Sequence, residues 1–151
     1  MKKTILFSCF FVLLGTLTGI YIFNSYKNNS IGTFKESYNY YFLQEGVYSN
    51  EEIMRENTKE LDNKLIDIEN DKYYVYLGIT TDQNVSDKIK QIYKNKGYQI
   101  YIKEVKLASE EFYNNVVQFD LLINNTEKEH EILTIEEVVL ANYEEIIKNS
   151  R

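Results

Sequence analysis

Proline and tryptophan are absent from this chain of 151 residues, and cysteine and histidine occur once each. The single cysteine, Cys9, excludes an intrachain disulfide and a zinc site built from several thiolates. The single histidine, His130, stands in the charged run 127–131, which is typical of a solvated helix start rather than of a catalytic or metal-binding group. The fold must therefore be stabilised by packing.

Basic residues are also scarce, with 17 lysines and arginines against 23 acidic residues and a formal net charge of -6. Binding to nucleic acid requires a basic surface, so we expect no nucleic acid partner. No glycine-rich phosphate loop or other cofactor motif is present. The acidic pairs Glu136-Glu137 and Glu144-Glu145 are expected to face solvent, because adjacent helical residues point in different directions. We therefore expect no enzyme activity, cofactor or metal.

One long apolar run lies near the N-terminus. Residues 4–23 carry no charge, and as a helix they would span about 30 Å, roughly the hydrocarbon core of a bilayer. Lys2 and Lys3 precede the run, which favours a cytoplasmic N-terminus. Residues 1–24 are therefore predicted to be a cytoplasmic start and a transmembrane helix, a single-pass anchor in the cell membrane with the rest of the chain outside the cytoplasm.

A cleavable signal peptide is the alternative for this segment. The apolar run is longer than the usual signal-peptide core, and Asn24-Ser25-Tyr26-Lys27 offers no cleavage site of small residues. Residues 25–39 are rich in Asn, Ser, Lys, Gly and Tyr, as expected of a short linker. Without proline this linker cannot be a stiff polyproline spacer.

The sequence beyond the linker contains one pattern twice, at a spacing of 32 residues. The repeated positions are Tyr41, Gly46, Ser49 and Ile53 in the first copy and Tyr73, Gly78, Thr81 and Val85 in the second. Each copy has an aromatic strand, a glycine, a hydroxyl residue at a helix start and an apolar helix position. Two copies predict a β-α-β-β-α-β unit.

The boundaries of this unit follow from strand alternation and from turn and capping residues. We expect strands at 40–48, 65–69, 72–80 and 98–105, with helices starting at Ser49 or Asn50 and at Val85. Asn70-Asp71 predicts a tight hairpin turn and Gly97 a helix C-cap. The predicted fold class is α+β, a ferredoxin-like domain at 40–107 with a four-stranded antiparallel sheet.

The C-terminal region, 108–151, has apolar residues at helical spacing and predicts two helices separated by Asn124-Asn125-Thr126. The apolar faces of this helical extension must be buried against each other, against the domain or against a partner. Whether the helices lie across the sheet is not decided by the sequence.

Two of the strand segments resemble those of a known family. Residues 42–49 (FLQEGVYS) resemble the opening motif of the SPOR domain, and 73–78 (YYVYLG) resemble its second motif. Gly97-Tyr98 stands where the last strand of that family begins. The resemblance covers residues 40–107.

The resemblance implies a noncatalytic peptidoglycan-binding module of bacterial division or sporulation proteins. Such modules recognise glycan strands that have lost their stem peptides, and membrane-anchored members hold them outside the membrane at the septum. The implied partners are peptidoglycan glycan strands, the membrane through residues 4–23, and division or sporulation proteins. The choice between vegetative division and sporulation stays open.

Alternation along the strands places a candidate glycan site on one sheet face. Aromatic rings on this face suit the apolar faces of sugars, amides suit hydroxyl and N-acetyl groups, and an ammonium suits a sugar carboxylate. The predicted glycan-binding residues are Phe42, Gln44, Gly46, Tyr74, Tyr76, Gln99, Tyr101 and Lys103. The opposite face, which two helices would cover, is predicted to carry Tyr41, Leu43, Val47, Val75, Leu77, Ile79, Ile100 and Ile102.

The alternative function is a membrane-anchored scaffold whose SPOR-like domain and C-terminal helices bind a protein instead of glycan. Exposure of the aromatic face distinguishes the two. An open face favours glycan binding, and a covered face favours the scaffold.

Overall fold

A computed structural model describes residues 37–150 of the chain. The predicted anchor at 4–23 and most of the predicted linker lie outside these residues. Within residues 37–150, no helix has both the length and the apolar composition that crossing a bilayer requires.

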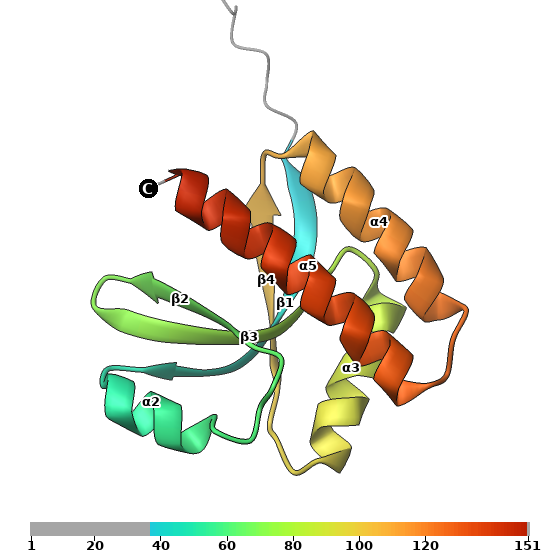
Figure 1. The fold of residues 1–151 in the computed structure, drawn as a ribbon. Coiled ribbons are helices and arrows are strands. Elements are labelled where there is room, and N and C mark those ends of the chain that lie inside the picture. The colour runs from blue at the N-terminus through green and yellow to red at the C-terminus, as the bar shows by residue number, and fades with distance from the viewer. Residues whose placement is uncertain (1–36, 151) are drawn as a thin grey trace, which may run out of the picture. The chain divides into compact units, whose positions relative to one another are not determined.

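The described residues form a four-stranded antiparallel sheet and four helices, as the α+β prediction requires (Figure 1). The sheet order is β2-β3-β1-β4. The elements in chain order are β1 (Tyr38–Tyr48), α2 (Glu51–Asn57), β2 (Leu65–Glu69), β3 (Lys72–Thr80), α3 (Gln83–Asn95), β4 (Tyr101–Leu107), α4 (Glu110–Asn124) and α5 (Glu129–Ser150). The strand β1 begins two residues before the predicted position, and β4 begins three residues after it.

The two copies of the repeat have matching helix caps. The Asn50 side chain accepts the backbone N–H of Ile53 at the start of α2, and the Asp82 side chain accepts those of Asn84 and Val85 at the start of α3. These two caps are also 32 residues apart. Capping of this kind satisfies N–H groups that have no partner inside the helix.

The predicted turns are confirmed by the backbone angles. Asn70 and Asp71 have φ of 50° and 58°, as a two-residue hairpin turn requires, and Gly97 has φ of 90° after the end of α3. The helix α2 is shorter than its apolar spacing predicts. Ile53, expected to point inward, is 56% exposed, and Met54 is buried in its place.

One hydrophobic cluster lies between the sheet and the helices α2 and α3. Leu43, Val75 and Leu77 come from the strands, and the other buried members are Met54, Leu61, Val85, Ile89, Ile92, Tyr93, Ile100, Ile123 and Ile132. The last two of these residues belong to α4 and α5. The C-terminal helices therefore share a core with the β-α-β-β-α-β unit, and residues 37–150 belong to one compact unit.

A second cluster lies on the other face of the sheet, beneath α4 and α5. Its buried members are Tyr40, Phe42, Leu65, Tyr76, Ile79, Phe112, Val116, Val139, Leu140 and Tyr143. Aromatic rings dominate it: the ring centroid of Phe42 lies 5.0 Å from that of Tyr143 and 5.2 Å from that of Tyr76. Figure 1 shows α5 crossing in front of the strands, with α4 beside it. The C-terminal helices thus cover the centre of the face that was predicted to bind glycan.

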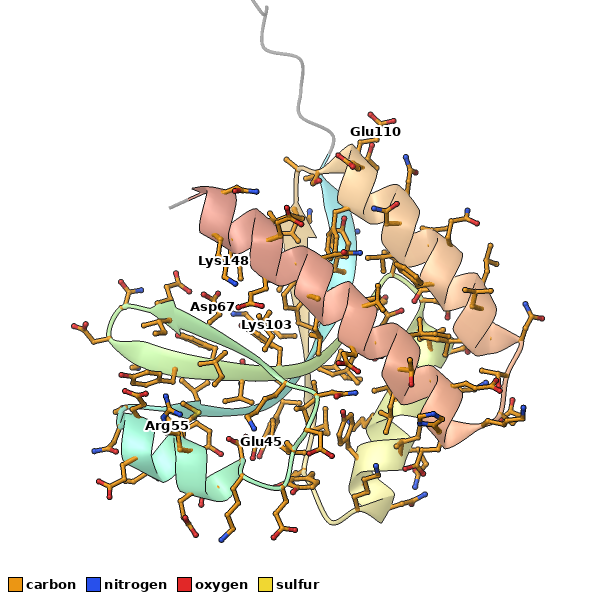
Figure 2. The ribbon with its side chains drawn as sticks, viewed as in Figure 1. Glu45, Arg55, Asp67, Lys103, Glu110 and Lys148 are labelled. Atoms are coloured by element: carbon orange, nitrogen blue, oxygen red, sulfur yellow. The ribbon has the colours of Figure 1, made fainter. Side chains whose placement is uncertain are left out.

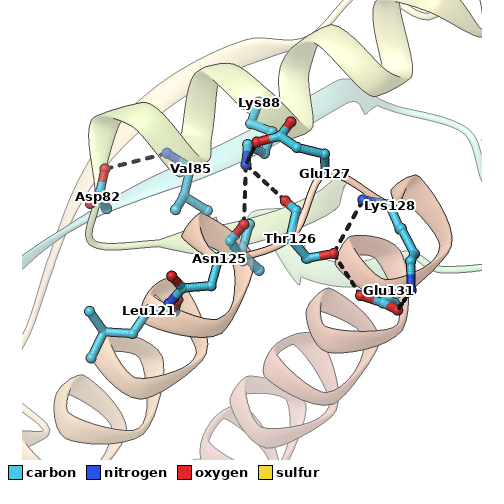
Figure 3. A network of polar contacts seen from close by, with 10 residues as sticks. Asp82, Val85, Lys88, Leu121, Asn125, Thr126, Glu127, Lys128 and Glu131 are labelled. Carbon is cyan, nitrogen blue, oxygen red and sulfur yellow. Dashed lines mark hydrogen bonds and ion pairs between the residues drawn. The ribbon is translucent and has the colours of Figure 1, made fainter.

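A polar network holds the turn between α4 and α5 against α3 (Figure 3). The ammonium of Lys88 on α3 donates to the backbone oxygens of Ile123 and Thr126, at 3.2 and 2.9 Å, and to the Glu127 carboxylate at 3.0 Å. The Ile123 oxygen in the last turn of α4 also accepts the backbone N–H of Thr126 at 3.3 Å, so the lysine adds a charged donor to one carbonyl at the helix end and to one in the turn that follows.

The change Lys88→Met is expected to lower the free energy of unfolding by about 1–3 kcal/mol, because two carbonyl oxygens lose their charged donor. Urea denaturation of the fragment 27–151 measures this value. Lys59→Met is the control, since Lys59 makes only an exposed ion pair with Glu56, and a change below about 0.5 kcal/mol is expected. Equal effects of the two substitutions would contradict the proposed role of Lys88.

Candidate functional site

The pairing of β1 with β3 is irregular at Gln44, and this changes which residues share a face. The register shifts between Leu43 and Gln44 and again between Gln44 and Gly46. Gly46 is opposite Val75 and Gly78 is opposite Leu43, and both partners belong to the core beneath α2 and α3. The prediction that Gly46 lies on the candidate face is therefore wrong, and Gly78 does not lie on that face either, because strict alternation fails at a β-bulge.

Both glycines are surrounded by the protein's own side chains. A Cβ on Gly46 would lie 2.9 Å from the ring of Tyr48, and one on Gly78 would lie 2.9 Å from Oε2 of Glu136. Gly78 therefore permits α5 to approach the sheet closely. The space beside each glycine is therefore occupied by a side chain of the protein itself.

The bulge also explains why two residues predicted to lie under α2 and α3 are found elsewhere. Ile79 is opposite Phe42 and belongs to the cluster beneath α4 and α5, so its predicted place under α2 and α3 is wrong. Val47 is opposite Tyr74 and is 43% exposed, although it was predicted to be covered.

Phe42 and Tyr76, two predicted glycan contacts, are buried. Their exposed fractions are 1% and 4%, and the ring of Tyr143 from α5 packs edge-on against Phe42. Burial raises the pKa of the Tyr76 hydroxyl well above its usual range. These two residues are part of the core and cannot contact a glycan while α5 is in place.

Four predicted residues remain at least partly exposed on this face: Gln44, Tyr74, Tyr101 and Lys103, which we call the open end of the sheet. Gln44 is opposite Tyr101, and Lys103 is opposite Phe42, so β1 and β4 present these side chains on one face. Tyr101 is 56% exposed, whereas Gln44 and Tyr74 are half-buried.

The open end has a defined internal geometry. The Lys103 ammonium lies 5.3 Å from the centroid of the Tyr74 ring, within the range of a cation–π contact. In Figure 2, Lys103 is seen in front of the sheet, between the β2–β3 hairpin and α5. The Tyr74 ring is stacked with that of Tyr76 at 6.4 Å, so it borders the buried centre of the face.

Gln99 lies outside the strands. It is exposed in the segment that joins Gly97 to β4, and the register of the sheet does not include it. Strand β4 begins at Tyr101 instead of Tyr98, so the predicted alternation that placed Gln99 beside Tyr101 does not apply there.

The position of Glu136 shows that another prediction, solvent exposure of the Glu136-Glu137 pair, is wrong for Glu136. It was expected to face solvent, but it is 1% exposed, and its Oε2 accepts the backbone N–H of Ile79 at 3.0 Å. The strand β2 pairs with β3 only as far as Tyr76, so Ile79 lies where β3 has no neighbour on that side. The sequence carried a signal for this burial, since Glu136 is four residues after Ile132 and three before Val139, both buried on α5.

The environment of Glu136 disfavours its charge. Burial raises the pKa of this carboxyl to about 8, the hydrogen bond from Ile79 opposes the rise, and the negative charge of Asp120 adds to it. Its second oxygen, Oε1, has no hydrogen-bond partner among the described residues. A buried acid without a basic partner is therefore held mainly in its protonated form at neutral pH.

Asp120 on α4 holds the same end of β3 through different contacts. Its carboxylate accepts the hydroxyls of Thr80 and Thr81, each at 2.6 Å, and the backbone N–H of Thr81 at 2.9 Å. Burial raises the pKa of Asp120 in spite of these bonds. Each C-terminal helix thus supplies one buried acid that binds the end of β3.

Among residues 37–150, no group of three or more histidine, cysteine or acidic side chains is arranged to hold a metal ion. His130 is exposed in the first turn of α5, as predicted for a solvated helix start, and Glu144 and Glu145 are exposed as well.

Comparisons of the chain with protein-family models, with curated proteins and with solved structures gave no match.

Glu136→Gln is expected to remove a pH dependence of stability. Because the folded pKa is raised above its ordinary value of 4.5, the fold binds this proton more tightly than the unfolded chain does. The free energy of unfolding of the native protein should therefore fall as the pH rises from about 4.5 through about 8. Relative to Glu136→Gln, we expect a loss of at least about 1 kcal/mol across this window.

The measurement is urea denaturation of the fragment 27–151 at a series of pH values. Glu137→Gln is the control, because Glu137 is the exposed neighbour on the same helix. Parallel pH profiles for the native protein and the Glu136→Gln variant would show that this carboxyl is not buried in its protonated form.

Proposed function

We propose that this chain is a noncatalytic protein, held at the cell membrane by residues 4–23, that binds glycan strands of septal peptidoglycan. The open end of the sheet is the single observation that carries the proposal. In it, two tyrosines, an amide and an ammonium from three strands remain accessible beside the α5 helix.

The chemistry of these side chains suits a sugar polymer. The exposed ring of Tyr101 can stack on the apolar face of a pyranose, and the Gln44 amide can both donate to and accept from hydroxyl or N-acetyl groups. The Lys103 ammonium can bind a sugar carboxylate.

The arrangement of the strands supports the same proposal. The order β-α-β-β-α-β, with the sheet order β2-β3-β1-β4, is consistent with a ferredoxin-like domain, which is the fold that the SPOR resemblance implies. The helices α4 and α5 are additions to that unit. They restrict the proposed glycan site to one end of the sheet.

A protein-binding scaffold is the second candidate, and two observations favour it. The centre of the aromatic face is covered, and the covering helices themselves expose Leu121, Leu122 and Val138 at 52%, 55% and 44%. Exposed aliphatic side chains on adjacent helices are a common feature of protein interfaces.

Co-sedimentation with purified cell-wall sacculi distinguishes the two candidates. The fragment 27–151 is expected to pellet more strongly with sacculi from which an amidase has removed the stem peptides. Tyr101→Ala and Gln44→Ala should each weaken this binding about fivefold or more, equivalent to about 1 kcal/mol, because each removes one contact of the open end.

Leu122→Ala is the matched control, since Leu122 is 55% exposed and Tyr101 is 56% exposed. It should bind stripped sacculi as the native fragment does. If a folded fragment fails to pellet with either preparation, the glycan proposal is wrong. A loss of binding in Leu122→Ala alone would instead favour the C-terminal helices as the binding surface.

A further inference from the structure

A cavity of about 500 Å³ adjoins the open end of the sheet. It is lined by Lys90 and Lys94 of α3 and by residues 97–101, which lead into β4. Tyr101 lines this cavity and also belongs to the open end, so the two sites share this residue. The cavity contains Gln99 as well, the predicted glycan residue that the sheet does not include.

The charge of the cavity is unusual for this acidic chain. Lys90 and Lys94 are four residues apart, which places both ammonium groups on the same side of α3. Neither ammonium group makes a hydrogen bond or an ion pair with another residue of the described part of the chain, whereas the ammonium groups of Lys88 and Lys96 pair with Glu127 and Glu129. Two cations side by side without an acid favour binding of an anion.

The remaining walls are suited to a sugar. The Gln99 amide and the Tyr101 hydroxyl have no partner among the described residues, so both are available for hydrogen bonding. The space beside Gly97 is unoccupied, since a Cβ at this position would have no atom within 4 Å. The cavity therefore combines two cations, an amide, an aromatic ring and free space.

We propose that this cavity binds a carboxylate-bearing sugar unit, with Lys90 and Lys94 contacting the carboxylate and Tyr101 and Gln99 contacting the ring and its substituents. This inference rests on the proposed glycan function and adds to it a subsite that distinguishes a carboxylate from a neutral group. Hydrolysis of the amide that links a stem peptide to its sugar leaves such a carboxylate. The subsite thus gives a physical reason for a preference for stripped strands, because an intact peptide leaves a neutral amide at that position.

The test uses the full chain in detergent and two probes of equal length. One is a purified glycan fragment without stem peptides, and the other is the same fragment with its carboxylates reduced to alcohols. Isothermal titration calorimetry at low salt is expected to give about tenfold tighter binding of the carboxylated fragment. The double variant Lys90→Gln and Lys94→Gln should lose this preference while its binding of the reduced fragment changes less than about twofold.

The matched control is Lys72→Gln with Lys106→Gln, which changes the net charge equally at two exposed lysines outside the cavity. It should keep the tenfold preference. If the cavity variant keeps the preference, or loses binding to both probes equally, the subsite is wrong and the glycan function stands. If the native chain binds neither probe, the glycan function is wrong, and the subsite with it.

Discussion

One hydrogen bond links the helix α5 directly to the sheet: the backbone N–H of Ile79 donates to the carboxyl of Glu136. The strand β2 is five residues long and leaves the end of β3 without a neighbour on that side. An unpaired N–H buried there would cost about 1–3 kcal/mol. Glu136 satisfies it from α5, and Gly78 makes room for the carboxyl. The helix α5 is thereby fixed across the sheet, with Ile132 in one hydrophobic cluster and Val139 in the other.

This crossing explains why only part of the aromatic face is accessible. The segment of α5 that follows Glu136 carries Tyr143 over Phe42, and Asp120 on α4 binds the same end of β3. Tyr101 and Lys103 lie on β4, the edge strand of the sheet, and remain exposed, although Lys103 is directly opposite the buried Phe42. A ligand-binding surface on these residues would be built on paired strands of the sheet in which two buried acids bind the end of β3.

The element order, the hairpin turn and the first helix cap, Asn50, could be predicted because each depends on a few neighbouring residues. The second cap was not predicted: the repeat placed the hydroxyl residue Thr81 at the helix start, whereas the Asp82 side chain caps α3. The positions of Gly46 and Phe42 could not be predicted in the same way. The first depends on a β-bulge that only the pairing of two strands produces, and the second on helices more than sixty residues later in the chain. Burial of Glu136 was readable from its spacing on α5, but its partner at the sheet edge was not.

We propose that glycan binds the open end of the sheet while α5 stays in place over the centre of the face. Nuclear magnetic resonance of the isotopically labelled fragment 27–151, titrated with glycan stripped of stem peptides, tests it most directly. We expect shifts of the Gln44 side-chain amide and of Tyr101, with the resonances of Phe42 and Tyr76 unchanged. Shifts confined to Leu121 and Leu122, or large shifts of Phe42 and Tyr76 that indicate displacement of α5, would contradict the account.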